Sequence, residues 1–343
     1  MRGPHAIPNR IAVNIDSLWC QPHVTPVDTL AVVFEQPQQL SVRTLELVPA
    51  TAADVVVAMR WSGISTGTEK LLFTGRMPPF PGLAYPLVPG YEGVGEVVTA
   101  GADSGREVGQ LVYVAGSRGF TGAQGLFGGQ AATVVAPGAK TIPLHAELGE
   151  RGTLLALAAT AHHALGDDPI THPAQMPELI VGHGALGRLI ARLVVLYGGT
   201  APTVWETNPV RRDGAQGYVV LHPDDDQRRN YRTICDVSGA DGLLDTLIER
   251  LAPGGEICLA GFYSEPVHFT FPPAFLREMR LRIAAQWKEH DLHTVARLAN
   301  DGTLDLHGLI THREPAARAA EAYATAFGDS RCVKMILDWR TAA

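Results

Sequence analysis

The chain has 343 residues, of which 46% are hydrophobic and 18% charged, so it is long enough for two folded domains and too apolar for a disordered protein. Its formal net charge of −7 and its lack of a basic block argue against nucleic acid as a partner. No apolar run reaches the roughly 18 residues of a membrane-spanning helix, and the N-terminal residues do not resemble a signal peptide, so we expect no integral membrane segment.

Residues 1–27 differ from the rest of the chain, because they are rich in Pro, His and Asn and have little periodicity. We interpret them as an N-terminal extension. They are either a disordered tail or sequence upstream of a true start at Val27, read from a GTG codon.

Residues 28–151 are predicted to form a β-rich, partly barrel-like domain. Short apolar and β-branched runs alternate there with turns that contain Gly and Pro. The predicted strands are 31–34, 55–61, 94–98, 111–114 and 132–135.

From residue 152 the pattern changes to strands that alternate with helices, which predicts a parallel, doubly wound α/β sheet over residues 152–301. Its predicted helices are 153–165, 188–197 and 243–251, and its predicted strands are 179–182, 203–206, 217–221, 232–237, 256–260 and 281–286. Residues 302–343, with a helix at 316–327 and a strand at 333–339, are expected to return to the first domain.

The clearest motif is LIVGHGALG at 179–187, an apolar strand that leads into a G-x-G-x-x-G turn and a helix. Such a turn lets the backbone approach a pyrophosphate, which binds at the N-terminus of the helix. A second apolar run ends in Glu206, about 20 residues after the last glycine, where this fingerprint places an acid for the ribose hydroxyls. These features predict a dinucleotide-binding Rossmann domain. A glycine-rich turn without a ligand would not explain Glu206.

We assign the cofactor contacts to the turn, to Glu206, to Arg211 beyond it, and to two residues that follow later strands. The set is Gly182, His183, Gly184, Ala185, Leu186, Gly187, Glu206, Arg211, Ser238 and Gly261. Arg211 and Arg212 would favour a 2′-phosphate, but a carboxylate at the strand end repels that group, so we predict NAD as the cofactor.

A β-rich domain followed by a Rossmann domain resembles the medium-chain dehydrogenase/reductase superfamily. Residues 61–69 (WSGISTGTE) resemble its G-I-C-G-T-D segment, and residues 88–96 (VPGYEGVGE) resemble its P-G-H-E-G-x-G segment. Further stretches look like one subfamily, the 3-hydroxyethyl bacteriochlorophyllide a dehydrogenases. They are 70–78 (KLLFTGRMP), 205–212 (WETNPVRR), 260–263 (AGFY), 271–277 (FPPAFLR) and 334–339 (KMILDW). The resemblance implies that the β-rich domain is a GroES-like catalytic domain.

The zinc ligands of that superfamily are missing. Ser65, Tyr91 and Ala156 stand where the resemblance places a cysteine, a histidine and a further ligand, and neither serine nor tyrosine is an ordinary zinc ligand. The four cysteines, Cys20, Cys235, Cys258 and Cys332, are far apart, which excludes a cysteine zinc cluster and indicates a reducing, cytoplasmic environment. We therefore predict no metal, although Glu69, Glu92 and His162 remain as alternative ligands.

Without a metal, hydride transfer from a secondary alcohol needs a group that takes the hydroxyl proton. Tyr91 is our first candidate to hold the substrate oxygen, with Ser65 and Thr68 as a relay. Glu69 and Glu92 are predicted as bases or anchors. His162 is placed near the nicotinamide, while its neighbour His163 is expected to point the other way.

The resemblance implies a tetrapyrrole substrate with a propionate group. Lys70, Arg76 and Arg118 are the candidate cations for it. Aromatic residues of the same loops are candidate walls for a planar ring: Phe73, Phe80, Tyr85, Phe120 and Phe127. Each of these side chains is also compatible with an ordinary surface or core position.

The function that follows from the resemblance is NAD-dependent oxidation of the C3 1-hydroxyethyl group of a (bacterio)chlorophyllide to acetyl. Two alternatives stay open: a zinc-free NADPH-dependent quinone or enone reductase of the same superfamily, and a non-catalytic dinucleotide-binding protein. The sequence also leaves the oligomeric state open, including a homo-oligomer.

Overall fold

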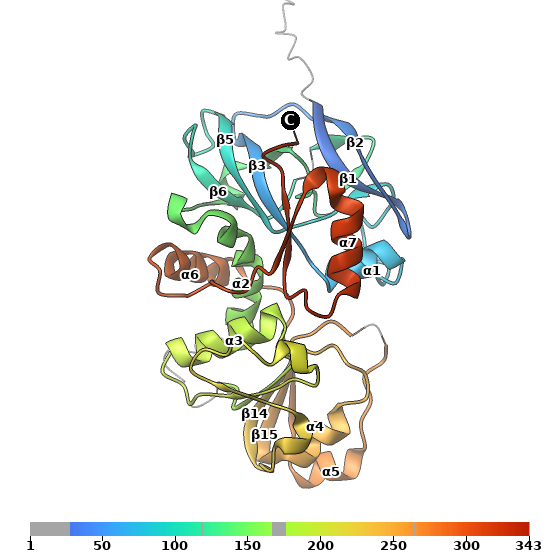
Figure 1. Cartoon of the computed structure of the whole chain (residues 1–343), viewed down its shortest axis with the longest axis vertical. Coiled ribbons are helices and arrows are strands. Elements are labelled where there is room, and N and C mark those ends of the chain that lie inside the picture. Colours follow the sequence, from blue (N-terminus) through green and yellow to red (C-terminus); the bar gives the residue numbers. More distant parts are fainter. Residues whose placement is uncertain (1–27, 118, 167–175, 264, 343) are drawn as a thin grey trace, which may run out of the picture.

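The computed structural model describes residues 28–117, 119–166, 176–263 and 265–342. Two sheets of a β-rich unit lie at one end of the molecule and a parallel sheet lies at the other, with helices α2 and α6 between them (Figure 1). The predicted α/β fold with a doubly wound sheet and a β-rich domain is therefore confirmed. The prediction about residues 1–27 falls outside the described residues.

The β-rich unit contains a five-stranded sheet in the order β7-β2-β1-β4-β8 and a seven-stranded sheet in the order β10-β6-β5-β3-β18-β17, with β9 paired to β3. The strands of the first sheet are β1 (Asp28–Gln36), β2 (Gln39–Leu47), β4 (Leu87–Val88), β7 (Phe120–Thr121) and β8 (Gln124–Gly125). Those of the second are β3 (Asp54–Ile64), β5 (Gly93–Ala100), β6 (Leu111–Val114), β9 (Thr133–Pro137), β10 (Thr141–Pro143), β17 (His312–Pro315) and β18 (Met335–Asp338).

All five strands predicted for this unit are present, and they pack apolar side chains between the sheets. Along β3 buried residues alternate with more exposed ones, which is the pattern of a strand with one face on a core. Helix α1 (Thr68–Thr74) was not predicted, because seven residues are too few to show a helical period. It ends at Gly75, whose φ of 72° is the left-handed conformation that glycine adopts at helix ends.

The second unit is a six-stranded parallel sheet in the order β13-β12-β11-β14-β15-β16. Its strands are β11 (Leu179–Val181), β12 (Thr203–Trp205), β13 (Val219–Leu221), β14 (Tyr231–Asp236), β15 (Leu251–Leu259) and β16 (Arg280–Ile283). The α-helices of this half are α2 (Leu155–Ala164), α3 (Ala185–Leu196), α4 (Leu244–Arg250), α5 (Phe271–Leu276) and α6 (Glu289–Asn300). All six predicted strands are found. β15 begins five residues earlier than the predicted 256, since a register shift opposite Tyr231 and Thr233 lets the strand continue through its glycines.

The C-terminal segment pairs with the β-rich unit. β18 runs antiparallel to β3, with Met335 opposite Ile64 and Asp338 opposite Trp61, and helix α7 (Ala319–Gly328) covers the same unit (Figure 1). The C-terminal strand therefore lies beside the end of β3 in the same sheet. The domain limits at residues 151 and 302 stay a prediction.

Helix α2 links the two units through a surface of small side chains. Its five alanines at positions 156, 158, 159, 161 and 164 are completely buried, and the helix packs against both α3 and α6. Small residues let helix axes approach closely, so α2 forms a rigid link next to the junction of the units.

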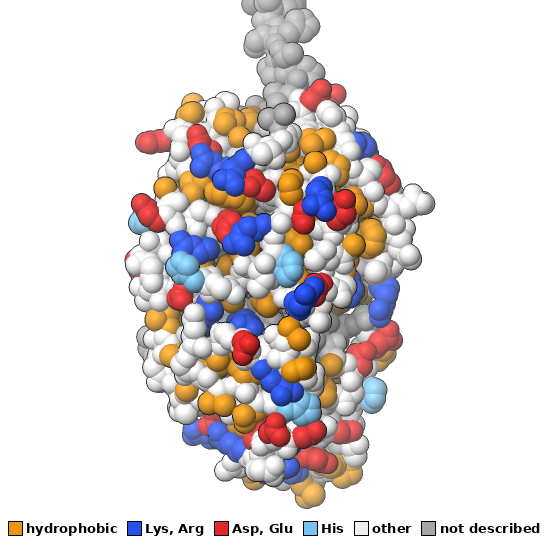
Figure 2. Space-filling view, in the orientation of Figure 1, with side chains coloured by type: hydrophobic (Ala, Val, Ile, Leu, Met, Phe, Trp, Pro, Cys, Tyr) orange, Lys and Arg blue, Asp and Glu red, His pale blue; other side chains and the backbone are white. Residues whose placement is uncertain are grey.

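None of the described helices is long and apolar enough to cross a membrane. On the face drawn in Figure 2, basic and acidic side chains are interspersed, so this face offers no continuous basic surface for nucleic acid.

Candidate active site

Three hydroxyl groups meet where β3 ends and α1 begins. Ser65 Oγ lies 2.7 Å from Tyr91 Oη, and Thr68 Oγ1 lies 3.4 Å from the same oxygen. The pairing of β3 with β5 brings these segments together, because Ser62 is opposite Gly93 and the Gly63 N–H donates to the Glu92 carbonyl. The structure thus unites the three residues that the sequence analysis placed around the substrate oxygen, and we name Ser65, Thr68 and Tyr91 the hydroxyl cluster.

The Tyr91 ring stands between two other aromatic rings. Its centroid lies 5.5 Å from that of Phe127, at an interplanar angle of 90°, and 6.0 Å from that of Trp287. Burial and the nearby Glu92 carboxylate raise the pKa of Tyr91, so its phenol keeps its proton at neutral pH. Tyr91 is therefore available as a hydrogen-bond donor, and its phenol is unsuited to be the final base.

A buried carboxyl group, Glu69, adjoins the hydroxyl cluster. Its Oε1 accepts the Ser65 N–H at 2.9 Å, and its Oε2 accepts the hydroxyl of Tyr323 from helix α7. Burial raises the pKa of Glu69 to about 7, although both hydrogen bonds oppose this shift. A carboxyl group of this kind takes up and releases a proton near neutral pH.

Glu92 forms a second buried acid, which is paired with Lys334 of the C-terminal segment. The Lys334 ammonium contacts Glu92 Oε2, and both side chains are almost completely buried. Burial raises the pKa of Glu92 in spite of the lysine, and Glu92 Oε1 has no hydrogen-bond partner among the described residues. Glu92, the residue after Tyr91, is thus held by its contact with Lys334, and among the described residues its carboxyl group makes no hydrogen bond to the cluster.

In the structure, the His162 side chain is held by Asp291 of α6. His162 Nδ1 is 2.6 Å from Asp291 Oδ1, and the imidazole packs edge-on against the Tyr197 ring, between α2, α3 and α6. We had expected His163 to point away, but its Nδ1 lies 3.0 Å from the other Asp291 oxygen. Burial opposes ionisation of Asp291, yet hydrogen bonds from the Lys288 N–H and from His162 lower its pKa. The two histidines therefore join α2 to α6, because a single buried carboxylate accepts from both.

The G-x-G-x-x-G turn has the conformation that a pyrophosphate requires. Gly182 has a φ of 106°, which strongly favours glycine, and a Cβ at Gly187 would lie 1.9 Å from the Gly182 carbonyl oxygen. Gly184 begins helix α3 without a side-chain cap and has open space where a side chain would project. The first backbone N–H groups of α3, at Ala185 and Leu186, therefore remain available for phosphate oxygens. The turn fits a dinucleotide.

Glu206 follows β12 and binds the same turn. Its Oε2 accepts the His183 N–H at 3.2 Å, and its Oε1 accepts the Asn208 N–H at 2.8 Å. The His183 side chain points inward instead, with Nδ1 2.6 Å from the Arg211 carbonyl and Nε2 2.8 Å from the Tyr218 hydroxyl. Burial lowers the pKa of His183 to about 4, so its imidazole is neutral. The part of His183 that faces a cofactor is its backbone.

The Arg211 side chain is directed away from the predicted ribose site. Its guanidinium donates to the carbonyls of Ser330 and Cys332, in the segment between α7 and β18. Arg212 Nε donates to the Glu206 carbonyl at 3.0 Å. Backbone carbonyls therefore occupy both guanidinium groups that the sequence analysis considered for a 2′-phosphate, and Arg211 instead connects the cofactor loop to the β-rich unit.

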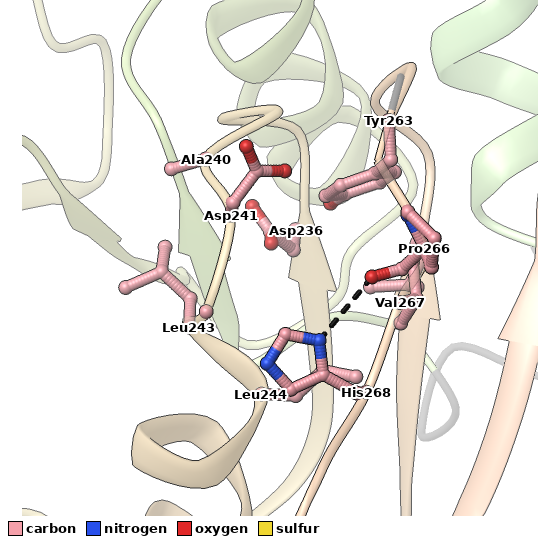
Figure 3. A pocket seen from close by; sticks show the side chains of 11 residues that line it. Asp236, Ala240, Asp241, Leu243, Leu244, Tyr263, Pro266, Val267 and His268 are labelled. Carbon is pink, nitrogen blue, oxygen red and sulfur yellow. Dashed lines mark hydrogen bonds between the residues drawn. The ribbon is translucent and has the colours of Figure 1, made fainter.

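Ser238 and Gly261 lie at the carboxyl ends of β14 and β15, which is where ligands bind in open parallel sheets. Ser238 Oγ donates to Asp236 Oδ1 at 2.7 Å, and the Gly261 N–H donates to the Asp236 carbonyl at 3.2 Å. A hollow opens beside them, where Tyr263 points toward Asp236 and His268 lies at the opposite end (Figure 3). Burial raises the pKa of Asp236.

Of the described residues, those predicted to bind the substrate do not form one cluster in the structure. The exposed Lys70 donates to the Phe327 carbonyl at 3.3 Å, and Arg76 lies 3.6 Å from Glu265 across the junction of the units. Arg118 lies outside the described residues. Phe127 is 37% exposed beside Tyr91, whereas Phe120 is buried in the core. Of these predicted residues, Phe127 is the one that contacts the hydroxyl cluster.

The residues at the superfamily's zinc positions do not fit that metal. The Ser65 and Tyr91 hydroxyls are hydrogen-bonded to each other, and Ala156 is completely buried and has no side chain that could bind zinc. Across the described residues, no three His, Cys, Asp or Glu side chains are grouped so that they hold a metal ion. Independence from zinc stays a prediction.

The sequence analysis missed three residues of this region: Trp287, Tyr323 and Lys334. Lys334 begins the KMILDW stretch that supported the resemblance, but no local pattern indicated its partner. Tyr323 and Glu69 are 254 positions apart, so only the folded chain brings them together.

Comparison with known proteins places the chain in a family. Residues 51–146 match the alcohol dehydrogenase GroES-like domain. The chain is 53% identical over 317 residues (92% of this chain, 100% of the relative) to the 2-desacetyl-2-hydroxyethyl bacteriochlorophyllide A dehydrogenase of Rhodobacter capsulatus. It is also 53% identical over 320 residues (92% and 99%) to the protein of the same name from Cereibacter sphaeroides.

The fold is shared more widely. L-idonate 5-dehydrogenase from Escherichia coli superimposes with a TM-score of 0.77 at 19% sequence identity, over 91% of this chain and 98% of that one. As the motifs at 61–78 and 88–96 predicted, the chain belongs to the medium-chain dehydrogenase/reductase superfamily and, within it, to the family of the 2-desacetyl-2-hydroxyethyl bacteriochlorophyllide A dehydrogenases.

Proposed function

We propose that this protein oxidises the C3 1-hydroxyethyl group of a (bacterio)chlorophyllide to acetyl in bacteriochlorophyll a biosynthesis, with NAD⁺ as the hydride acceptor. The hydroxyl cluster carries the proposal, because Tyr91 Oη is 2.7 Å from Ser65 Oγ at the positions where the superfamily places two of its zinc ligands, so the two hydroxyls stand in for the metal beside the alcohol. The names of the two relatives at 53% identity supply the substrate.

In this mechanism Tyr91 and Ser65 orient the alcohol and conduct its proton. The substrate hydroxyl donates to Tyr91 Oη, while Tyr91 donates to Ser65 Oγ. When the substrate proton moves to Tyr91, the Tyr91 proton moves to Ser65, so no tyrosinate forms on a phenol whose pKa is raised. A nicotinamide dinucleotide held by the turn at Gly182–Gly187 and by Glu206 would supply the acceptor for the hydride of the carbinol carbon.

Glu69 is our candidate for the proton acceptor. It is held against the Ser65 nitrogen, and its pKa of about 7 matches the working pH of a general base. Lys334 balances the charge of Glu92 nearby, so the second acid does not need to take the proton. As Ser65 Oγ receives the Tyr91 proton, its own hydroxyl proton passes to Glu69 through a water molecule, because the direct contact of Glu69 is with the Ser65 nitrogen. The products are then the ketone, the reduced nicotinamide and one proton on Glu69.

The preference for NAD⁺ rests on Glu206. Its carboxylate binds two N–H groups of the cofactor loops and lies where a ribose 2′-hydroxyl would donate to it. The NADPH-dependent reductase alternative would need cations at this place, but Arg211 and Arg212 donate to backbone carbonyls. A cytoplasmic location is part of the proposal, and the oligomeric state stays open.

The test is an assay of NADH formation with a 3-(1-hydroxyethyl) chlorin and NAD⁺, with the acetyl product identified by its loss of two hydrogens. We expect stoichiometric NADH and ketone. Reduction of a quinone by NADPH, without oxidation of the chlorin, would favour the reductase alternative. Failure of both reactions would favour a non-catalytic dinucleotide-binding protein.

A further inference from the structure

Two aromatic side chains flank the hydroxyl cluster, and they come from different units of the molecule. Phe127 lies between β8 and β9 in the β-rich unit, whereas Trp287 lies between β16 and α6 in the parallel-sheet unit. Their ring centroids lie 5.5 Å and 6.0 Å from the centroid of Tyr91. The Tyr91 ring, whose hydroxyl would hold the substrate oxygen, therefore has one aromatic neighbour from each unit.

Neither flanking ring is fully covered by protein. Phe127 is 37% exposed and Trp287 is partly exposed, in contrast to core rings such as Phe34, which is completely buried. Exposed aromatic surface next to polar groups is typical of a ligand-binding wall, because covering it releases water from apolar area. These two rings thus have apolar surface available beside the hydroxyl cluster.

The chemistry of the substrate brings it to this surface. The carbinol carbon of a 1-hydroxyethyl group is bonded directly to the macrocycle. When its hydroxyl lies about 2.7–3.0 Å from Tyr91 Oη, the nearest macrocycle carbon is therefore roughly 5 Å or less from that oxygen. The macrocycle is therefore brought next to the Tyr91 side chain, against whose ring Phe127 and Trp287 pack.

We propose that Trp287 and Phe127 form an aromatic platform that recognises the planar macrocycle, with Trp287 as the specificity-determining residue from the nucleotide-binding side. This inference rests on the proposed function, since it names how that function's substrate is bound. Stacking on aromatic side chains stabilises bound planar ligands, as it does for nucleic-acid bases. Because the two residues belong to different units, the macrocycle would bridge the junction.

The experiment measures binding separately from turnover. Titration of the NAD⁺-loaded enzyme with a 3-(1-hydroxyethyl) chlorin, followed through the pigment's absorbance shift, gives its Kd. Trp287→Leu should raise this Kd at least fivefold, whereas Trp287→Phe should keep it within about threefold of the wild type. Phe127→Leu is the second variant, on the other unit, and should also raise the Kd.

Phe275→Ala is the matched control, because Phe275 is a 66% exposed ring on α5 that stacks on Phe271, outside the hydroxyl cluster. It should leave the chlorin Kd unchanged. NAD⁺ affinity should stay within about twofold in every variant, and thermal melting verifies that each one folds.

The outcomes separate this inference from the proposed function. Unchanged chlorin Kd in both leucine variants overturns the platform, even if the wild type oxidises the chlorin. A weaker NAD⁺ affinity with unchanged chlorin affinity in Trp287→Leu also overturns it, because Trp287 would then be a cofactor contact. Binding that depends on Trp287, in a wild type that makes no NADH, supports the platform and refutes the dehydrogenase.

Discussion

Replacing Tyr91 with phenylalanine removes one oxygen atom from the hydroxyl cluster and keeps the ring that packs against Phe127 and Trp287. The lost contacts are those at 2.7 Å to Ser65 Oγ and 3.4 Å to Thr68 Oγ1. Because Ser65 is buried, the loss of its partner should cost about 1–3 kcal/mol of unfolding free energy. This is less than the total stability of about 5–15 kcal/mol of a typical domain, so the variant should fold.

The expected effect on catalysis is larger. Loss of one acid–base group typically lowers the rate by about 10²–10⁴-fold, and the lower limit corresponds to about 2.7 kcal/mol of transition-state stabilisation. Steady-state NADH formation with a saturating chlorin should show kcat reduced by roughly 10²-fold or more. NAD⁺ affinity, measured by titration, should be unchanged because Tyr91 makes no contact with the glycine turn.

Tyr231→Phe is the control. It removes a buried hydroxyl that donates to Asp226 at 2.7 Å in the parallel sheet, so it should lower Tm without changing kcat. If the Tyr91→Phe variant has the wild-type kcat, the role of Tyr91 is limited to packing. Glu69 and Ser65 would then have to act on the alcohol without the Tyr91 hydroxyl.

Five further predictions concern Glu69, the cofactor loop and metal. Wild-type kcat should rise with pH through about 7, as Glu69 loses its proton, and Glu69→Gln should be slow and lack this step. Burial holds the native pKa of Glu69 above its unfolded value of 4.5, so the native state binds the proton more tightly than the unfolded state. The free energy of unfolding should therefore fall by up to about 3 kcal/mol as the pH rises from 4.5 to 7. Denaturant unfolding of Glu69→Gln at pH 5 and pH 8 should show that this pH-dependent part of the stability is gone. The wild type should prefer NAD⁺ to NADP⁺ at least tenfold in kcat/KM, about 1.4 kcal/mol, and Glu206→Ala should narrow that ratio; equal use of both cofactors by the wild type would contradict the role of Glu206. Arg211→Gln should change the ratio of kcat/KM for NAD⁺ to that for NADP⁺ by no more than about twofold, because the Arg211 guanidinium contacts Ser330 and Cys332. A loss of activity with NADP⁺ alone would show that Arg211 reaches the 2′-phosphate. Treatment with EDTA should leave activity intact, whereas inactivation that Zn²⁺ reverses would disprove metal independence.

Much of the cofactor site was predictable because its determinants are local. The positions of Gly182, Gly187 and Glu206 follow from one strand–turn–helix unit and the next strand. The backbone geometry of such a unit depends mainly on residues that are neighbours in the sequence. The side chains of that site were less predictable. His183 turned inward because Tyr218 and the Arg211 carbonyl satisfy both of its ring nitrogens, and the sequence contains no local sign of that pairing.

The candidate catalytic residues divide in the same way. Ser65 and Tyr91 were found because two motifs of the family mark positions that share one site. The partner of His162 was not predictable, because successive helix residues face directions about 100° apart and Asp291 lies on a different helix, α6.

By itself, the sequence determined the fold class, the six parallel strands, the dinucleotide turn and the family, because hydrophobic periods, glycine spacing and motif strings are properties of short segments. Only the tertiary structure decided that Tyr323 holds Glu69, that Lys334 is paired with Glu92, and that Trp287 stands beside Tyr91. These contacts join segments of the chain that are far apart in sequence. They form because sheet register and helix packing bring distant side chains together, and buried polar groups need hydrogen-bond partners. The residues next to each position in the sequence do not indicate which distant side chain will be its partner.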